Sequence, residues 1–190
     1  GIGFYGAHLR ISHGSYGGWD SFGLEKTVTK SNANVLFEID GKNALQSYKN
    51  YLGKYAEELP GSALLFPLAV TLEESGETVV RTILSINEND QSMIFAGDLP
   101  VGSKVRFMKA NFDRLIDAAS LAARTSLTSI PDMNPQLAIL ISCVGRKLIL
   151  SSRIEEEVEA VRDILGTKTA ITGFYSYGEI SPVNESARCE

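Results

Sequence analysis

The chain has 190 residues, of which 44% are hydrophobic and 22% charged, which is typical of one large globular domain or one domain with part of another. A net charge of −5 and the lack of any run of Lys and Arg argue against a nucleic-acid-binding protein. No apolar run approaches the roughly 20 residues that cross a membrane, and no secretory signal is recognisable. Because the chain begins at Gly1 without Met, we expect a piece of a longer protein.

The cysteine content indicates a reducing compartment. Cys143 and Cys189 are the only cysteines, and they form no CxxC motif. Two cysteines cannot make a metal cluster alone, and one disulfide is no framework. We therefore expect two free thiols and a cytoplasmic protein.

The first 62 residues predict two strands and one helix. Residues 1–11 alternate weakly and predict a strand, whereas residues 12–23 hold four glycines and predict a loop. Residues 33–40 predict a short strand that ends in Asp-Gly. Residues 42–59 predict a helix, and residues 59–62 a break that is the best candidate boundary. The helix stripe consists of Leu45, Tyr48, Tyr51, Leu52 and Tyr55.

Four short strands follow the break. The segments 63–72, 78–86, 92–99 and 104–110 are apolar or alternating, and turn residues separate them. This order predicts an antiparallel meander. Pro67 cannot donate to a strand ladder, so its strand is expected at an edge or at a bulge.

The last third alternates between helices and strands. Residues 111–130 predict a helix. Residues 135–144 are continuously apolar, which predicts a strand covered on both faces, and residues 145–150 are expected to continue it after a turn. A final strand is predicted over residues 170–182.

A second helix is predicted at residues 153–166. Ser152 and Glu155 suggest a capping box at its start, and Gly166 suggests its end. The run of three glutamates at 155–157 predicts a solvated first turn that suits the helix dipole. The inward face is expected to hold Ile154, Val158, Val161 and Leu165.

Together these elements predict an α+β fold with a mixed, largely antiparallel β-sheet and helices packed on it. The two strands near 140 and 175 are joined through a helix, and ligands bind beyond the carboxyl ends of such strands. This places a candidate ligand site at two short segments. Its residues are Ser142, Cys143, Gly145, Arg146, Tyr175, Tyr177, Gly178 and Glu179.

An arginine and a glutamate suit an amino-acid-like ligand. If the strands are neighbours, Arg146 can bind a carboxylate and Glu179 an ammonium group, while tyrosines supply flat walls. The alternative is that Arg146 and Glu179 simply pair with each other, since buried charges are usually paired.

Catalytic and metal chemistry have little support. A nucleophilic Cys143 needs a base such as histidine, and His8 and His13 lie far upstream. A cysteine in an apolar strand behaves as a small hydrophobe. P-loop, GxGxxG and GxSxG motifs are absent. We expect no catalytic residue, no metal site and no enzyme.

Three ordered segments resemble the FIST family of bacterial sensory domains. They are "NVLFEIDGKNALQSYKNYLG", "ISCVGRKLIL" and "GFYSYGEISP". The resemblance runs from about residue 20 to 182. It implies that residues 1–40 are the end of an N-terminal FIST half and that residues 41–190 form a FIST C-terminal-type sensory domain.

The resemblance also implies a function. FIST domains stand beside histidine kinases and other bacterial signalling proteins, and are thought to bind small molecules such as amino acids. It implies a small-molecule ligand, an effector such as a histidine kinase in a two-component system, no nucleic acid and no membrane. It also supports the eight candidate residues as a family-marked region. We expect no cofactor in this chain.

The resemblance leaves a haem-binding role open. Some FIST proteins bind haem and sense nitric oxide, and here the axial ligand would be His8 or His13. The nearby aromatic side chains are Phe4, Tyr5, Tyr16 and Trp19. A cysteine-dependent enzyme that uses Cys143 and a structural or homodimerisation module are two further hypotheses.

Overall fold

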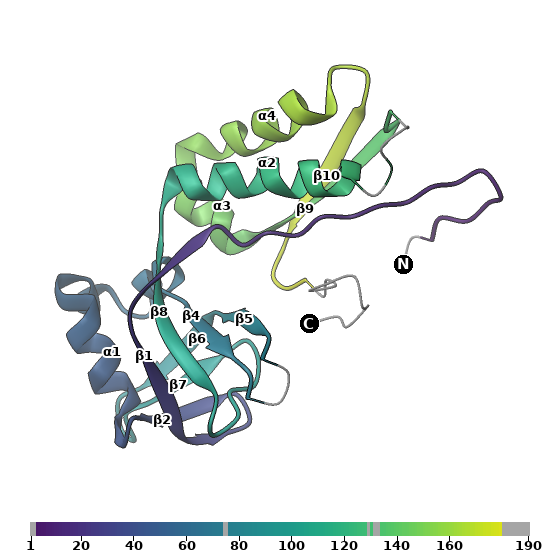
Figure 1. Cartoon of the computed structure of the whole chain (residues 1–190). Helices are drawn as coiled ribbons and strands as arrows, with labels where there is room; N and C mark the ends of the chain where they lie inside the picture. Colours follow the sequence, from purple (N-terminus) through teal and green to yellow (C-terminus); the bar gives the residue numbers. More distant parts are fainter. Residues whose placement is uncertain (1–2, 74–75, 129, 131–133, 180–190) are drawn as a thin grey trace. The chain divides into compact units, whose positions relative to one another are not determined.

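The computed structural model of the chain describes residues 3–73, 76–128, 130 and 134–179. The chain divides into two compact units, each treated separately below (Figure 1). Unit 1 consists of residues 1–18 and 112–190, and unit 2 of residues 19–111. The fold is α+β with a mainly antiparallel sheet, which confirms the predicted class. None of the described helices is long and apolar enough to cross a membrane.

The described part of unit 2 contains an eight-stranded sheet. Its path of neighbours is β5-β4-β8-β1-β2-β7-β6, and β3 pairs with β2. All of these pairings are antiparallel. The strands are β1 (Trp19–Asn32), β2 (Val35–Ile39), β3 (Lys42–Asn43), β4 (Leu68–Thr71), β5 (Thr78–Arg81), β6 (Ile83–Asn87), β7 (Ser92–Phe95) and β8 (Lys104–Ala110).

The predicted meander is wrong in its order, although its strands exist. β4 and β5 form one hairpin and β6 and β7 another, but β1 and β2 lie between β8 and β7. The strand following Pro67 is interior, between β5 and β8, so the edge prediction is also wrong. Pro67 causes no conflict because it immediately precedes Leu68, the first residue of β4.

Strand β1 was not predicted, whereas the described part of residues 1–11 forms no helix or strand. β1 was hidden because its exposed polar residues and Gly23 obscure the alternation. It pairs with both β2 and β8, so this long strand joins the two halves of the sheet.

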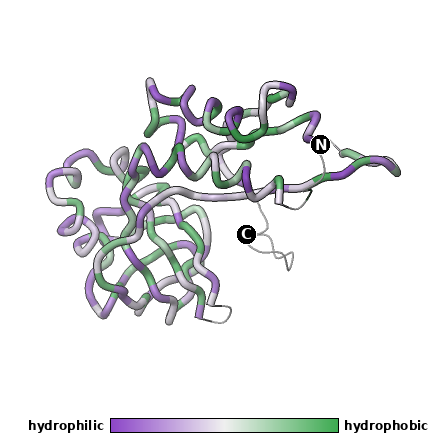
Figure 2. The backbone as a smooth tube through the Cα atoms, turned by 45° about the horizontal axis from the view of Figure 1, so that its top comes forward, coloured by the Kyte–Doolittle hydropathy of each residue, from purple (hydrophilic) through white to green (hydrophobic). Residues whose placement is uncertain are grey.

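The core of unit 2 follows from alternation along the strands. In β8, Val105 and Phe107 are buried, whereas Lys104 and Arg106, which alternate with them, are exposed, and Val70 of β4 is buried too. Figure 2 shows hydrophobic and hydrophilic residues interleaved along the backbone. The buried residues of these strands therefore meet in one apolar core cluster, to which β1 also contributes.

Helix α1 (Ala44–Leu52) closes this core with the predicted stripe. Leu45 and Tyr48 are fully buried, and the Tyr48 hydroxyl donates to the Phe66 carbonyl at 2.8 Å. Burial raises the pKa of Tyr48 far above its ordinary value. Two short 3-10 helices follow, at Gly53–Glu58 and Gly61–Leu65.

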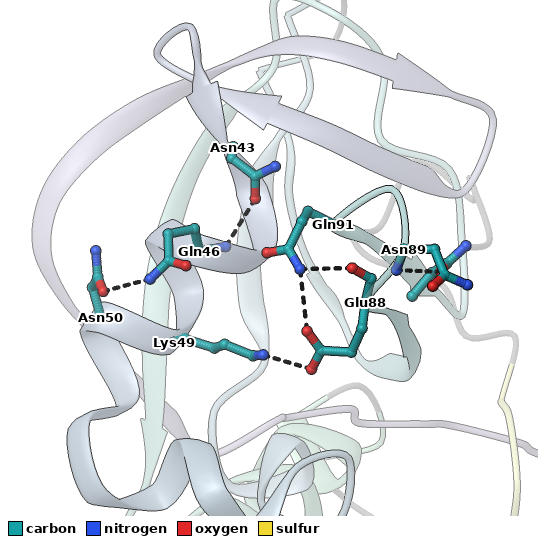
Figure 3. Close-up of polar contacts among 8 residues, drawn as sticks. Asn43, Gln46, Lys49, Asn50, Glu88, Asn89 and Gln91 are labelled. Atoms are coloured by element: carbon teal, nitrogen blue, oxygen red, sulfur yellow. Dashed lines mark hydrogen bonds and ion pairs between the residues drawn. The ribbon is translucent and has the colours of Figure 1, made fainter.

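Polar contacts hold α1 against the turn between β6 and β7 (Figure 3). Asn43 caps the helix by accepting from the Gln46 N–H at 2.9 Å. Lys49 donates to Glu88 at 2.5 Å, and Glu88 also accepts from the Gln91 side chain at 3.1 Å. The backbone N–H of Leu45 donates to the Gln91 carbonyl at 3.3 Å.

The described part of unit 1 contains three α-helices and a two-stranded sheet. The helices α2 and α4 pack against each other, and the strands β9 and β10 are parallel. A short 3-10 helix, Ser151–Arg153, precedes α4. The elements are α2 (Phe112–Thr128), β9 (Leu137–Cys143), α3 (Val144–Leu150), α4 (Ile154–Leu165) and β10 (Ala170–Ser176).

Two local predictions in unit 1 are wrong. Residues 145–150 belong to α3, not to a continued strand, because short apolar runs suit either element. Cys143 caps α3 by accepting from the Gly145 N–H at 3.3 Å. The capping box is absent: α4 begins after Arg153, and no side-chain cap bond is formed there.

The two-stranded sheet is not covered on both faces within the described chain, contrary to the prediction. Leu137, Ile139 and Ile141 lie on the same face of β9, and their side chains are 42–55% exposed. Their partner in β10, Phe174 opposite Ile141, is 59% exposed. The continuous apolar run of β9 therefore combines one half-buried face with one open face.

The N-terminal segment of unit 1 runs directly against α2. A Cβ atom on Gly14 would overlap the carbonyl of Ala122 in that helix. The Tyr16 hydroxyl also accepts from Thr125 at 3.4 Å. Close backbone approach to α2 thus requires glycine at position 14, and also at position 18, where a Cβ atom would lie 2.8 Å from the Arg114 carbonyl oxygen.

Candidate functional site

The parallel pair of strands brings the predicted site residues to one edge. In the register of β9 and β10, Tyr175 stands opposite Ser142 and Ser176 opposite Cys143. Since both strands end there, the segments after Cys143 and after Ser176 leave the sheet at the same edge. The structure therefore brings the two predicted segments together.

Arg146 is buried, with 6% of its surface exposed, and is fully engaged by protein groups. Its Nε donates to Glu157 at 2.6 Å, Nη1 to the Gly17 carbonyl at 2.5 Å and Nη2 to the Leu115 carbonyl at 2.5 Å. These bonds connect α3 with α4, α2 and the N-terminal segment. Arg146 thus ties four parts of unit 1 together.

Glu157 completes this polar centre. It is 6% exposed and also accepts from the Ser142 hydroxyl, at 3.2 Å to each oxygen. Tyr175 lies close enough that burial first, and the Glu157 charge second, raise the pKa of its hydroxyl. Lys147 sits over the Tyr175 ring, with Nζ 5.0 Å from its centre.

The three residues that follow β10 form the accessible part of this edge. Tyr177 is 94% exposed, and Gly178 and Glu179 are exposed too. The Ser176 hydroxyl donates to the Gly178 carbonyl at 2.7 Å, which fixes the turn. Partial burial raises the pKa of the Glu179 carboxyl. The remaining residues of the quoted motif, Ile180–Pro182, lie outside the described residues.

The alternative that Arg146 and Glu179 simply pair with each other is wrong. Among the described residues, the ion pair of Arg146 is with Glu157, not with Glu179. Glu157 was predicted to be solvated, and that prediction is wrong. Its spacing from Val161 was the available signal, because residues four apart share a helix face and both are buried. Val158, predicted inward, is 37% exposed.

Cys143 and the histidines can be located too. Cys143 is a free thiol at the start of α3, and its sulfur accepts from the Gly145 N–H. His8 and His13 are exposed. Among the described residues, no bond joins Cys143 to a histidine. The predicted free thiol at Cys189 lies outside the described residues.

The fit of these histidines to haem is partial. They can supply an imidazole ligand, but the neighbouring Phe4, Tyr5 and Tyr16 are 49–93% exposed. Haem pockets depend on an enclosing environment around the metal. The described residues around His8 and His13 do not provide one, and haem binding stays a prediction. Across the described part of the chain, no three His, Cys, Asp or Glu side chains are placed to hold a metal ion.

Comparison with known protein families identifies the family of this chain. The FIST C domain model matches residues 44–182, which is more than half of the chain, and the FIST N domain model matches residues 1–42. The chain belongs to the FIST family. FIST domains are signal-transduction sensory domains, so a sensory role follows at that level.

Similarity beyond the family is limited. An uncharacterized protein of Methanocaldococcus jannaschii is 24% identical over 159 residues, covering 76% of this chain and 30% of that protein. The chain thus spans about a third of the length of this relative. No solved structure matches. The two FIST models meet near residue 43, whereas the compact units divide after residues 18 and 111. The FIST N match therefore includes β1 and β2, which lie in unit 2.

Proposed function

We propose that this FIST chain senses a small amino-acid-like molecule at the carboxyl edge of β9 and β10. One observation carries the proposal: the parallel register joins Ser142 with Tyr175, and the exposed residues Tyr177 to Glu179 continue from the same edge. Ligands of sheets with helical crossovers bind at such edges. The proposal extends the sensory role of the family to a location and a ligand class.

The accessible groups suit a zwitterion. The Glu179 carboxylate would accept hydrogen bonds from a ligand ammonium group, and the Tyr177 ring would offer its face to the same cation. The exposed ammonium of Lys147, above the Tyr175 ring, would bind the ligand carboxylate. A Cβ atom added to Gly178 would meet nothing within 4 Å, so this residue leaves room at the edge.

In this proposal the buried groups hold the site and do not touch the ligand. All three nitrogens of Arg146 already donate to protein oxygens, and Glu157 binds Arg146 and Ser142. Ser142 and Glu157 thereby fix the end of β9 relative to α4. Cys143 and Gly145 form the first turn of α3, which positions Lys147.

The proposed role is non-catalytic, because the Cys143 sulfur is engaged as a helix cap and the described residues show no base bound to it. We propose that a separate signalling partner such as a histidine kinase reads the occupied site. A bacterial, cytoplasmic two-component pathway and a homodimer are parts of the same proposal.

Thermal denaturation of the chain with each amino acid tests the ligand class. A ligand at one hundred times its dissociation constant stabilises the folded protein by about 2.7 kcal/mol, so a binder raises the melting temperature. Glu179→Gln should reduce that rise for the same amino acid. Glu155→Gln, an exposed glutamate at the start of α4, is the matched control and should keep it.

Two outcomes would count against the proposal. If no amino acid raises the melting temperature, a structural or dimerisation module is the better account of this edge. If the rise is equal in the wild type, Glu179→Gln and Lys147→Gln proteins, the ligand binds somewhere else.

A further inference from the structure

An irregularity in strand β1 opens the outer face of the sheet in unit 2. Phe22 pairs with Phe107 of β8, but the next pair is Lys26 with Val105. Three residues of β1, numbers 23–25, therefore stand opposite Arg106 alone. Gly23 takes a φ of +74°, which side chains disfavour. Bulges of this kind redirect side chains and are frequent beside binding sites.

A hollow of about 290 Å³ lies beside this bulge. It is on the outer face, because Lys104 and Arg106 of β8 are exposed whereas Val105 and Phe107 point into the core. Ala69 stands opposite Arg106 in the register of β4 and β8, and its small side chain leaves room for the hollow. Its polar lining consists of Ser21, Glu25, Thr71, Thr78, Lys104 and Arg106.

The charges of this hollow are only loosely satisfied by protein. Arg106 Nε lies 3.8 Å from Glu25 Oε2, and the two side chains are 50% and 46% exposed. Such a long, exposed ion pair contributes little and is readily exchanged for a ligand. Lys104 Nζ donates to the neutral Thr27 hydroxyl at 2.8 Å. The Thr27 backbone N–H chiefly lowers the pKa of the nearby Asp40 carboxyl, and the charge of Lys104 adds to this effect.

Hydroxyl groups complete the lining. Thr71 and Thr78 lie 2.7 Å apart and form a hydrogen bond across β4 and β5. Each hydroxyl can donate or accept, so the pair adapts to either kind of ligand group. All these groups come from strands, which fix positions better than loops do.

We propose that this hollow binds a small carboxylate that also carries a hydroxyl or ammonium donor. The Arg106 guanidinium can hold a carboxylate through two parallel hydrogen bonds, with Lys104 adding a second positive charge. Glu25 accepts from the donor group of the ligand. A phosphate dianion suits the hollow less, because Glu25 repels its second negative charge.

The volume sets the size of the ligand. At about 290 Å³ the hollow is at the lower limit of small-molecule sites, so it suits a molecule of a few carbon atoms. This site lies wholly in unit 2 and does not depend on the β9–β10 edge.

Amide NMR titration of the whole 190-residue chain with four matched probes tests the proposal. Lactate and alanine carry the carboxylate and a donor, propionate lacks the donor, and propylamine lacks the carboxylate. We expect lactate or alanine to shift the amide signals of Glu25, Thr78 and Arg106. Propionate and propylamine should each bind at least about tenfold more weakly, as expected for losing one or more hydrogen bonds to a charged group.

Variants separate this site from the rest of the protein. Arg106→Gln should weaken binding at least about tenfold, and Thr78→Val should weaken it while keeping the shape of the side chain. Lys30→Gln, an exposed lysine further along β1 that pairs with Glu38, is the control and should bind normally. Glu179→Gln should also bind normally, which keeps this test independent of the proposed function.

Several results would overturn the proposal. These are the absence of shifts at Glu25, Thr78 and Arg106 with lactate and alanine at millimolar concentration, equal binding by propionate, or binding unchanged in Arg106→Gln. Inorganic phosphate that shifts the same signals more strongly than lactate would overturn the ligand class.

Discussion

The two units of this chain are organised by different interactions. Unit 2 surrounds an apolar core to which its long strands and α1 contribute, with Leu36, Leu68 and Phe95 completely buried. Unit 1 has a buried ion pair, Arg146 with Glu157, where three helices and the N-terminal segment meet. Its described sheet has two strands and leaves apolar residues of β9 half exposed.

This difference indicates where each unit is vulnerable. An apolar core loses stability in proportion to the volume removed, and its neighbours relax in part. A buried ion pair instead fails abruptly when one partner is removed, since the remaining charge has no counterion in a medium of low polarity. The units should therefore respond differently to matched substitutions.

The largest effect is expected from removing the charge of Glu157. Glu157→Gln leaves the Arg146 guanidinium buried without its carboxylate, and breaking such a pair typically costs about 3–5 kcal/mol. Hydrogen–deuterium exchange should show the loss of protection in β9, α3 and α4, while strands β4 and β8 keep theirs. Glu155→Gln, two residues earlier on the exposed side of α4, should leave exchange unchanged.

A double substitution sharpens the same prediction. Replacing the pair by apolar residues, as in Arg146→Met with Glu157→Leu, should recover much of the lost protection because no unpaired charge remains. If Glu157→Gln alone exchanged like the wild type, the ion pair would not be the organising centre of unit 1.

A pair of leucine substitutions compares the two units directly. Leu68 in β4 is completely buried, whereas Leu137 in β9 is 50% exposed. Leu68→Ala should destabilise unit 2 by about 2–5 kcal/mol through the cavity it creates. Leu137→Ala should cost unit 1 much less, because half of its side chain already meets water. Urea denaturation followed by exchange of unit-specific peptides measures both, and equal losses would mean that the face of β9 is covered by something else.

The sequence predicted the elements of the fold better than their arrangement. Periodicity located α1, α2 and α4 and most strands, because burial on one face is written into local spacing. Strand order was not predictable from local pattern. β1 inserts between β8 and β2, and its Gly23 bulge and polar exposed residues concealed the strand.

The meeting of the two candidate segments was predicted from the sequence, but the contacts within them were not. The carboxyl ends of β9 and β10 do meet, and Ser142 and Tyr175 are opposite each other. The partner of Arg146 was missed because three consecutive glutamates look like a solvated turn. Only the packing of α4 shows that Glu157 faces inward while Glu155 does not.

The smallest effect concerns an exposed ion pair in unit 2, which contrasts with the buried pair of unit 1. The hydrogen bond from Lys49 holds the pKa of Glu88 below its ordinary value of 4.5. A carboxyl with a lowered pKa in the folded state adds stability above the ordinary pKa, and that contribution disappears as the pH falls through the lowered value. The melting temperatures of wild type and Glu88→Gln should therefore differ slightly at neutral pH and converge only as the pH falls through the lowered pKa, which lies below the ordinary glutamate value.

The same measurement distinguishes this contact from general charge effects. High salt should reduce the difference at neutral pH, because exposed charges are screened. Glu57→Gln removes another exposed carboxylate of unit 2 and should show no comparable convergence. A difference between wild type and Glu88→Gln that persisted unchanged at acidic pH would show that the charge of Glu88 is not the source of the effect, because the wild-type carboxyl is then neutral as well.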